Sequence, residues 1–314
     1  MNRFEQQRAE ASGPRFDVDV PENGYRWWYV DGVSNDGKHG IVVIAFIGSV
    51  FSPYYFRARQ RGPAEPERHC AINVALYDKH VGRWCMTERS ESSLSRDAGH
   101  FTVAGSSLHW DGDALRIHVD ERSAPWFRKV TGDIVLRPHG LNDTGFVPDA
   151  NARHLWHPIA PVANIDVTMS SPAWGWTGSG YFDTNCGSEP LEAGFRRWSW
   201  SRSAGHRDCR IDYAIEQRDG MHRSTSLHFD DSGGITEQEL PPRIDLQTGL
   251  WQVQRHVFSD HHPQSVRDLE DTPFYTRSLL NYGERHDMHE FLDLDRFRSG
   301  WVRFLLPFRM PRRR

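Results

Sequence analysis

The stretch that decides the fold is Tyr25-Arg26-Trp27-Trp28-Tyr29-Val30-Asp31, or YRWWYVD. Four of its first five residues are aromatic, and successive side chains of a strand point to opposite faces of a sheet. Both faces of this strand must therefore be covered. One interpretation is a two-layer core. The other is a cavity for a large apolar ligand, with Trp27, Trp28, Tyr54 and Tyr55 as ligand-binding residues.

Strand patterns continue along the chain. Residues 115–121 alternate Leu115, Ile117 and Val119 with polar side chains, and a turn at residues 111–113 joins them to a predicted arm at residues 100–109. Alternation at residues 211–216 and the glycines at 233–234 predict another strand-turn-strand unit. Helical periodicity is weak, and residues 265–271 are the best helix candidate. We therefore predict an all-β fold whose strands curl or close to protect their edges.

The domain organisation is predicted from irregular segments. Residues 1–15 are polar and without apolar periodicity, which is typical of a loose tail. Residues 138–161 are rich in Asn, Asp, Gly and Pro and are the best place for a boundary. We expect a disordered tail at residues 1–15 and two β domains, at residues 16–160 and 161–314.

Charge and hydropathy exclude several classes of function. The 314 residues carry a net charge of only −4, so nothing indicates nucleic-acid binding. The longest apolar run, residues 41–51, is far shorter than the ~20 residues that span a bilayer. The four cysteines form no Cys-x-x-Cys pair and follow no secretory leader, which favours buried, reduced thiols in the cytoplasm.

Large apolar residues and arginines alternate near the end of the chain. Trp301, Phe304 and Phe308 lie close to Arg303, Arg309 and the arginines at 312–314. Such a mixture suits a membrane interface, where rings enter the headgroup layer and cations meet anionic lipid. The alternative is a final strand followed by a solvated basic tail.

The best candidate for chemistry is the segment of residues 174–185, WGWTGSGYFDTN. Its single acid, Asp183, lies among glycines and the rings of Trp174, Trp176 and Tyr181. Glycine allows close approach of the backbone to a ligand, and aromatic walls exclude water while tolerating a cation. Desolvation would push Asp183 toward its protonated form. The alternative is a Trp-rich hairpin in which Asp183 only caps a turn.

Metal and cofactor chemistry find little support in the sequence. There are 17 histidines, but the close groups do not have the Cys or carboxylate spacing of a zinc site. No Gly-rich phosphate loop follows a strand, and no nucleophile elbow is present. We therefore expect no metal and no cofactor, and an enzyme of this sequence would use acid and base groups.

Long segments of the chain resemble the bacterial carotenoid 1,2-hydratase family, also called hydroxyneurosporene synthase. The resemblance covers GYRWWYVDGVSNDGKHGIVVIAFIGSVFSPYYFRAR (24–59), HCAINVALYDKHVGRWCMTER (69–89), WGWTGSGYFDTNCGSEPLEAGFRRWSWSR (174–202) and MHEFLDLDRFRSGWVRFLLPFRMPR (288–312). It implies two lipocalin-like β domains. It also implies hydration of the terminal C1–C2 double bond of acyclic carotenoids such as neurosporene and lycopene, on the route to spheroidene or spirilloxanthin in phototrophic bacteria.

The resemblance also implies a set of catalytic residues. The family's two residue pairs match His154 and Trp156 in HLW, and Tyr181 and Asp183 in YFD. Asp183 would protonate the alkene, the Trp156 and Tyr181 rings would stabilise the tertiary carbocation, and His154 would orient the water or accept its proton. Trp174 and Trp176 join the predicted substrate-binding residues.

A carotenoid substrate has consequences for location. A chain of about forty carbons partitions into membranes, so we expect peripheral contact on the cytoplasmic side through the basic, aromatic C-terminus. Two other functions stay open. One is a lipocalin-like isoprenoid carrier without catalysis, and the other is a cofactor-free isoprenoid cyclase on the same scaffold.

Overall fold

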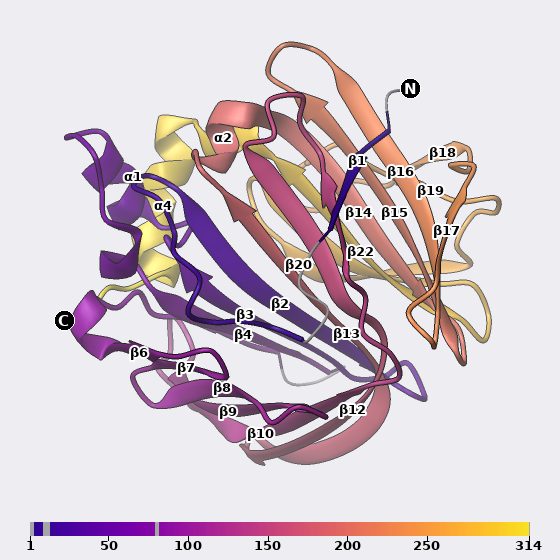
Figure 1. The fold of residues 1–314 in the computed structure, drawn as a ribbon, viewed down its shortest axis with the longest axis horizontal. Helices are drawn as coiled ribbons and strands as arrows, with labels where there is room; N and C mark the ends of the chain where they lie inside the picture. The colour runs from indigo at the N-terminus through magenta and orange to yellow at the C-terminus, as the bar shows by residue number, and fades with distance from the viewer. Residues whose placement is uncertain (1–2, 9–12, 79–81, 314) are drawn as a thin grey trace.

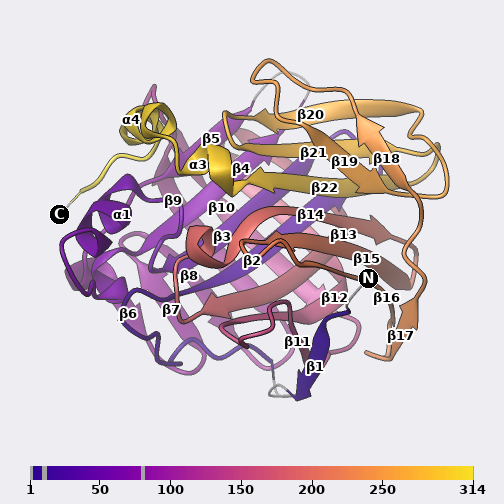
Figure 2. The ribbon, with the colours of Figure 1, turned by 90° about the horizontal axis from the view of Figure 1, so that it is seen from above.

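Two large antiparallel sheets dominate the computed structural model, which describes residues 3–8, 13–78 and 82–313. Figure 1 shows the first sheet curling into a half-barrel below strands β2 to β4, while the second sheet lies against its upper face. Seen from above, the strands of the second sheet cross those of the first (Figure 2). The predicted all-β fold is confirmed.

The first sheet has thirteen strands among the described residues. Its main path runs through β5 (Arg83–Met86), β4 (Ala71–Tyr77), β3 (Gly40–Ile47), β2 (Tyr25–Ser34), β13 (Ala173–Gly187), β12 (His154–Ser171), β10 (Lys129–Pro138), β9 (Leu115–Arg122), β8 (Ser106–Trp110), β7 (His100–Val103) and β6 (Leu94–Arg96). At its margin β11 (Thr144–Val147) pairs with β12 and with β1 (Glu5–Arg8).

The second sheet has seven strands among the described residues. In spatial order they are β17 (Ile235–Gln238), β16 (His222–Asp230), β15 (Asp208–Gln217), β14 (Phe195–Ala204), β22 (His286–Asp293), β21 (Tyr275–Asn281) and β20 (Ser265–Asp271). A separate hairpin pairs β18 (Arg243–Leu246) with β19 (Arg255–Phe258).

Strand β2 is buried on both faces, which explains its density of aromatic residues. Trp27 and Tyr29 belong to the core between the two sheets, whereas Trp28 and Val30 belong to the core enclosed by the curled first sheet. Both faces of the YRWWYVD stretch are therefore covered, as the interpretation of a two-layer core required. We call these two clusters the inter-sheet core and the half-barrel core.

Short helices gather at one end of the sheets (Figure 1). They are α1 (Pro53–Arg59), α2 (Leu191–Gly194), α3 (Leu294–Phe297) and α4 (Gly300–Arg309), with 3₁₀ turns at Pro66–Arg68 and Glu91–Ser93. In α4, Val302 and Leu306 are buried one turn apart, whereas Trp301, Phe304 and Phe308 are exposed. The alternative of a final strand was wrong, because this spacing follows the helical period.

Three further expectations are corrected by the strand pairing. Residues 265–271 form β20 rather than a helix, because hydrogen bonds to β21 decide the conformation of this short segment. The arm at residues 100–109 is itself a hairpin, with β7 and β8 joined around Ala104, whose φ is positive. Within the expected tail, Glu5–Arg8 pairs with β11; residues 1, 2 and 9–12 lie outside the described residues.

The predicted boundary at residues 160/161 lies inside β12. That strand pairs with β13 across this position, and β13 pairs in turn with β2. Strands from both sides of the boundary therefore share the first sheet. The four cysteines are free; Cys70, Cys85 and Cys209 are buried, whereas Cys186 is half-buried.

Candidate active site

Asp183 lies in the middle of the first sheet. It is on β13, opposite Pro158 of β12 and Tyr29 of β2. Side chains two residues apart on a strand share a face, so Tyr181, Asp183 and Asn185 all point toward the second sheet. The alternative role of capping a turn does not apply, because Asp183 is within a fifteen-residue strand.

Three side chains donate hydrogen bonds to the Asp183 carboxyl group. The Tyr181 hydroxyl donates to Oδ2 at 2.7 Å, and Trp156 Nε1 donates to the same oxygen at 2.9 Å. Asn185 Nδ2 lies 3.3 Å from Oδ1. Because Oδ2 already accepts two hydrogen bonds, a proton on this carboxyl group belongs on Oδ1.

Burial raises the pKa of Asp183 to about 8. Only 4% of the residue is exposed, and desolvation disfavours the carboxylate. The hydrogen bonds from Tyr181 and Trp156 act in the opposite direction, and the negative charges of Glu290 and Asp31 raise the pKa further. At neutral pH Asp183 is therefore mostly a neutral acid.

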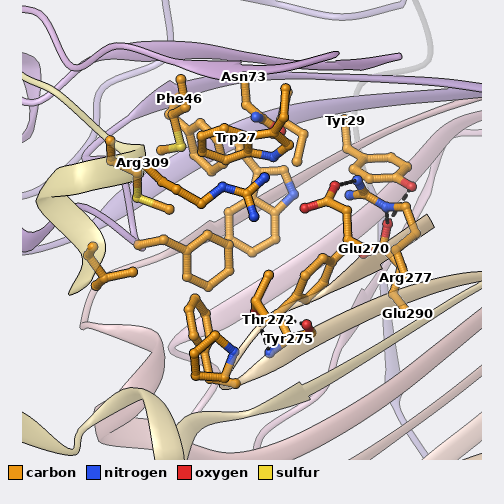
Figure 3. A pocket seen from close by; sticks show the side chains of 18 of the residues that line it. Trp27, Tyr29, Phe46, Asn73, Glu270, Thr272, Tyr275, Arg277, Glu290 and Arg309 are labelled. Atoms are coloured by element: carbon orange, nitrogen blue, oxygen red, sulfur yellow. Dashed lines mark hydrogen bonds and ion pairs between the residues drawn. The ribbon is translucent and has the colours of Figure 1, made fainter. Parts of the chain in front are cut away.

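The acid faces a cavity of about 380 Å³ between the two sheets and α4. Most of its walls are aromatic or aliphatic: Trp27, Tyr29, Ile44, Phe46, Phe51, Trp84, Met86, Trp156, Trp198, Trp200, Tyr213, Trp251, Phe274, Tyr275, Val302, Leu305, Leu306 and Phe308. Figure 3 shows part of this lining. Leu305 and Phe308 are 37% and 66% exposed, so the cavity reaches the surface at α4.

A charged network faces the same cavity (Figure 3). Arg277 contacts Glu270 at 2.5 Å and Glu290 at 2.8 Å. The Tyr29 hydroxyl donates to Glu290 Oε1 at 2.7 Å, and Tyr77 hydrogen-bonds to both Arg277 and Glu270. Arg277 is fully buried, and its two carboxylate partners hold its pKa well above the usual range against the effect of burial.

Of the four predicted catalytic residues, the structure brings three together. Trp156, Tyr181 and Asp183 form one hydrogen-bonded group. His154 lies elsewhere, with Nδ1 2.9 Å from the Tyr25 hydroxyl and Nε2 3.4 Å from Glu189 Oε1. It is absent from the described cavity lining. The structure therefore gives no support to its expected role of holding water, because both ring nitrogens face protein partners outside the cavity.

Of the predicted substrate-binding residues, Trp27 alone is among the described cavity-lining residues. Trp28 points into the half-barrel core on the opposite face of β2. Trp174 and Trp176 stack on each other at 6.1 Å and pack against that same core.

The two tyrosines of α1 also lie away from the cavity. The Tyr55 hydroxyl donates to the Gly24 carbonyl at 2.7 Å, so this side chain fixes α1 to the chain before β2. Tyr54 lies near Arg312, whose guanidinium is 5.9 Å from its ring centre.

Much of the cavity wall was not predicted from the sequence. Trp198, Trp200 and Tyr213 come from the second sheet, and Arg277 and Glu290 complete its charged part. The WSW pattern at residues 198–200 carried a signal, since two tryptophans at a spacing of two share one face of a strand. Nothing local marks Glu290, whose partners lie on other strands.

Fold and site together define a protein with two packed β sheets, an aromatic cavity and a neutral buried acid. Comparison with known protein families identifies its class: the family model described as "Carotenoid hydratase CrtC" matches residues 43–314. The chain belongs to this carotenoid hydratase family.

Individual relatives agree with this assignment. A protein of Thiocapsa roseopersicina named acyclic carotenoid 1,2-hydratase is 46% identical over 96% of this chain and 76% of its own length. A protein of the same name from Rubrivivax gelatinosus is 42% identical over the same shares. Another from Cereibacter sphaeroides is 38% identical over 86% of this chain and 98% of its own length.

Solved structures show a likeness of the fold alone. Kievitone hydratase from Nectria haematococca covers 94% of this chain and is itself fully covered, with a TM-score of 0.52 and 10% identity. CghA in complex with Sch210972 has a TM-score of 0.51 and 13% identity, over 92% of this chain and 98% of that one.

Proposed function

We propose that this chain is an acyclic carotenoid 1,2-hydratase, a hydro-lyase that adds water across the terminal C1–C2 double bond of carotenoids such as lycopene and neurosporene. Its family and the names of its relatives support this activity. The single structural observation that carries the mechanism is a neutral acid, Asp183, buried at the wall of an aromatic cavity.

The first chemical step is protonation of the alkene. Asp183 transfers its Oδ1 proton to C2, the π electrons form the new C–H bond, and a tertiary cation remains at C1. As charge develops on the carboxylate, the hydrogen bonds from Tyr181 and Trp156 to Oδ2 stabilise it. These donors are already in place, so little reorganisation is needed at the moment of reaction.

The aromatic walls stabilise the cation. Trp156 and Trp200 face the cavity beside the acid, and the ring of each can interact with a positive charge. A desolvated cation–π contact contributes about 2 kcal/mol. Tyr181 does not line the cavity, so its role is to donate a hydrogen bond to Asp183 rather than to contact the cation. Capture of water at C1 then gives the tertiary alcohol.

The substrate enters from the side of α4. A cavity of about 380 Å³ accommodates the end of a long polyene, and the remainder extends through the opening beside Leu305 and Phe308. At α4 and the adjoining loop lie exposed apolar residues and one half-buried ring, Trp251, which we together call the α4 rim: Leu250, Trp251, Trp301, Phe304, Leu305 and Phe308. Trp251 stacks on Trp301 at 5.9 Å, which joins the loop before β19 to α4.

This rim is suited to peripheral contact with the cytoplasmic side of a membrane. Rings at the rim would enter the headgroup layer, while the exposed Arg309 and Arg313 meet anionic lipid. Arg312 is instead paired with the buried Glu88. Arg314 of the predicted basic tail lies outside the described residues. No helix in the described part of the chain is long and apolar enough to cross a bilayer.

The activity is tested by incubating the purified protein with lycopene in H₂¹⁸O. Hydration gives a product heavier by one labelled water for each end that reacts. A cyclase would give a product of unchanged mass, and a carrier would return unchanged lycopene. Either of these outcomes would exclude the proposed activity.

A further inference from the structure

A second carboxylate faces the cavity from the sheet opposite Asp183. Glu290 is on β22, and 13% of its side chain is exposed. Tyr29 and Arg277 both donate hydrogen bonds to Glu290, and Oε1 accepts both of them. The two donors orient the carboxylate while the lone pairs of Oε2 can accept a hydrogen bond from water in the cavity.

Tyr29 contacts Glu290 and is the strand partner of Asp183. In the pairing of β2 with β13, Tyr29 lies directly opposite Asp183, and its hydroxyl reaches across the cavity to Glu290 (Figure 3). Glu290 in turn lies opposite Trp200 in the second sheet, and the Trp200 ring packs 5.4 Å from that of Tyr181. The two carboxyl groups therefore line one cavity from opposite sheets, and Glu290 is near enough for its charge to raise the pKa of Asp183.

The charge of the network favours a cation in this cavity. Arg277 lies between Glu270 and Glu290. Asp271 and Arg309 also line the cavity, so three carboxylates and two guanidinium groups give it a net formal charge of −1. The nearby Arg202–Asp31 pair is fully buried and neutral overall. In a cavity from which water is excluded, a fixed negative charge stabilises a developing carbocation more than it would in solution.

We propose that Glu290 is the general base that binds the reacting water and accepts its proton. This inference rests on the proposed hydration activity. After Asp183 protonates C2, the water oxygen forms a bond to C1, its O–H bond breaks, and the proton moves to Glu290. Asp183 has then lost one proton and Glu290 has gained one. Transfer of that proton to Asp183 through water restores both groups, so that alkene and water have become the alcohol.

The experiment separates protonation of the alkene from capture of water. In D₂O, the Glu290→Gln protein should still form the cation, which returns to alkene by giving a proton to the Asp183 carboxylate. We expect recovered lycopene to gain deuterium while hydration falls by about 100-fold or more, the usual contribution of a positioned base. Asp183→Asn should abolish both exchange and hydration. Glu237→Gln, on the exposed edge strand β17, is the matched control and should behave as wild type.

Two results would overturn the role of Glu290. One is hydration by folded Glu290→Gln protein close to the wild-type rate. The other is loss of deuterium exchange together with hydration in protein that still folds and binds lycopene, because Glu290 would then serve the acid step or the structure. If Glu290→Gln does not fold, Glu290→Asp withdraws the carboxylate by one methylene and is judged by the same two readouts. Failure of the wild-type protein to hydrate lycopene would instead refute the proposed function.

Discussion

The hydroxyl of Tyr181 donates a 2.7 Å hydrogen bond to Oδ2 of Asp183, two residues further along β13. The period of two along a strand places both side chains on one face, and the cross-strand Trp156 completes the contact. An acid that must give up a proton to a weakly basic alkene needs burial to stay protonated and donors to stabilise its anion. The Tyr181–Asp183 pair combines both features.

Replacing Tyr181 with Phe should shift the pH profile of hydration. The loss of this donor raises the pKa of Asp183 above about 8, because its hydrogen bond favours the carboxylate. The alkaline limb of kcat/KM should move to higher pH, and the rate at pH 7 should fall by roughly 100-fold, as when one donor to a developing anion is removed. Tyr55→Phe, which removes a hydroxyl bound to Gly24 far from the cavity, is the control and should leave the profile unchanged. An unshifted limb in Tyr181→Phe would contradict the assignment.

Protein stability should fall with rising pH because of Asp183. Its folded pKa of about 8 lies above the ordinary value of 3.8, so the folded state binds this proton more tightly. The resulting stabilisation is fully present below about pH 4 and is lost as pH rises through about 8, at about 1.4 kcal/mol per pH unit in between. Urea unfolding of wild type and Asp183→Asn between pH 5 and 9 measures this as a difference in slope. Parallel curves would show that the pKa is not raised.

Replacing His154 with Asn should affect stability more than chemistry. The substitution disturbs buried contacts to Tyr25 and Glu189, so the melting temperature should fall. The alkaline limb of the pH profile should stay in place, and kcat of the folded protein should change less than in Tyr181→Phe. Loss of turnover without loss of stability would restore His154 to the reaction.

Removing two rings of the α4 rim should weaken membrane contact. Trp301 and Phe304 are 48% and 69% exposed and are not among the described cavity-lining residues, so serine at both positions removes apolar surface without opening the core. Partitioning to anionic vesicles, measured by co-sedimentation, should drop severalfold, while turnover of detergent-solubilised lycopene changes little. The control is Val266→Ser, on β20, which removes exposed apolar surface outside the rim. Equal partitioning of the two variants would remove the proposed contact.

The sequence predicted the local parts of this site and missed the parts that depend on sheet packing. The family resemblance paired Tyr181 with Asp183, and their spacing of two along β13 places both on one face. Which residues of β2 share a face with Tyr181 and Asp183 depends on the register that pairs Tyr29 with Asp183. No local sequence pattern encodes this register. Trp28 was therefore predicted to bind substrate together with Trp27, whereas its ring packs into the half-barrel core. Glu290 enters the cavity only because the second sheet packs across the first.

The conformation of the C-terminus shows the same limit. The apolar and basic composition of residues 301–313 was visible in the sequence, but a strand and a surface anchor were the alternatives considered. Helix α4 buries Val302 and Leu306 against the inter-sheet core and turns its remaining rings outward. Its composition indicated a surface role, but its position beside the cavity opening could be seen only in the three-dimensional structure.

The role of Asp183 as the acid is tested by the rate at which purified Asp183→Asn protein incorporates ¹⁸O from labelled water into lycopene. Asparagine keeps the shape of the side chain and can still accept hydrogen bonds from Tyr181 and Trp156, but it has no acidic proton to transfer. We predict a folded protein that binds lycopene and incorporates no label above the background without enzyme. Incorporation at the wild-type rate would contradict the account.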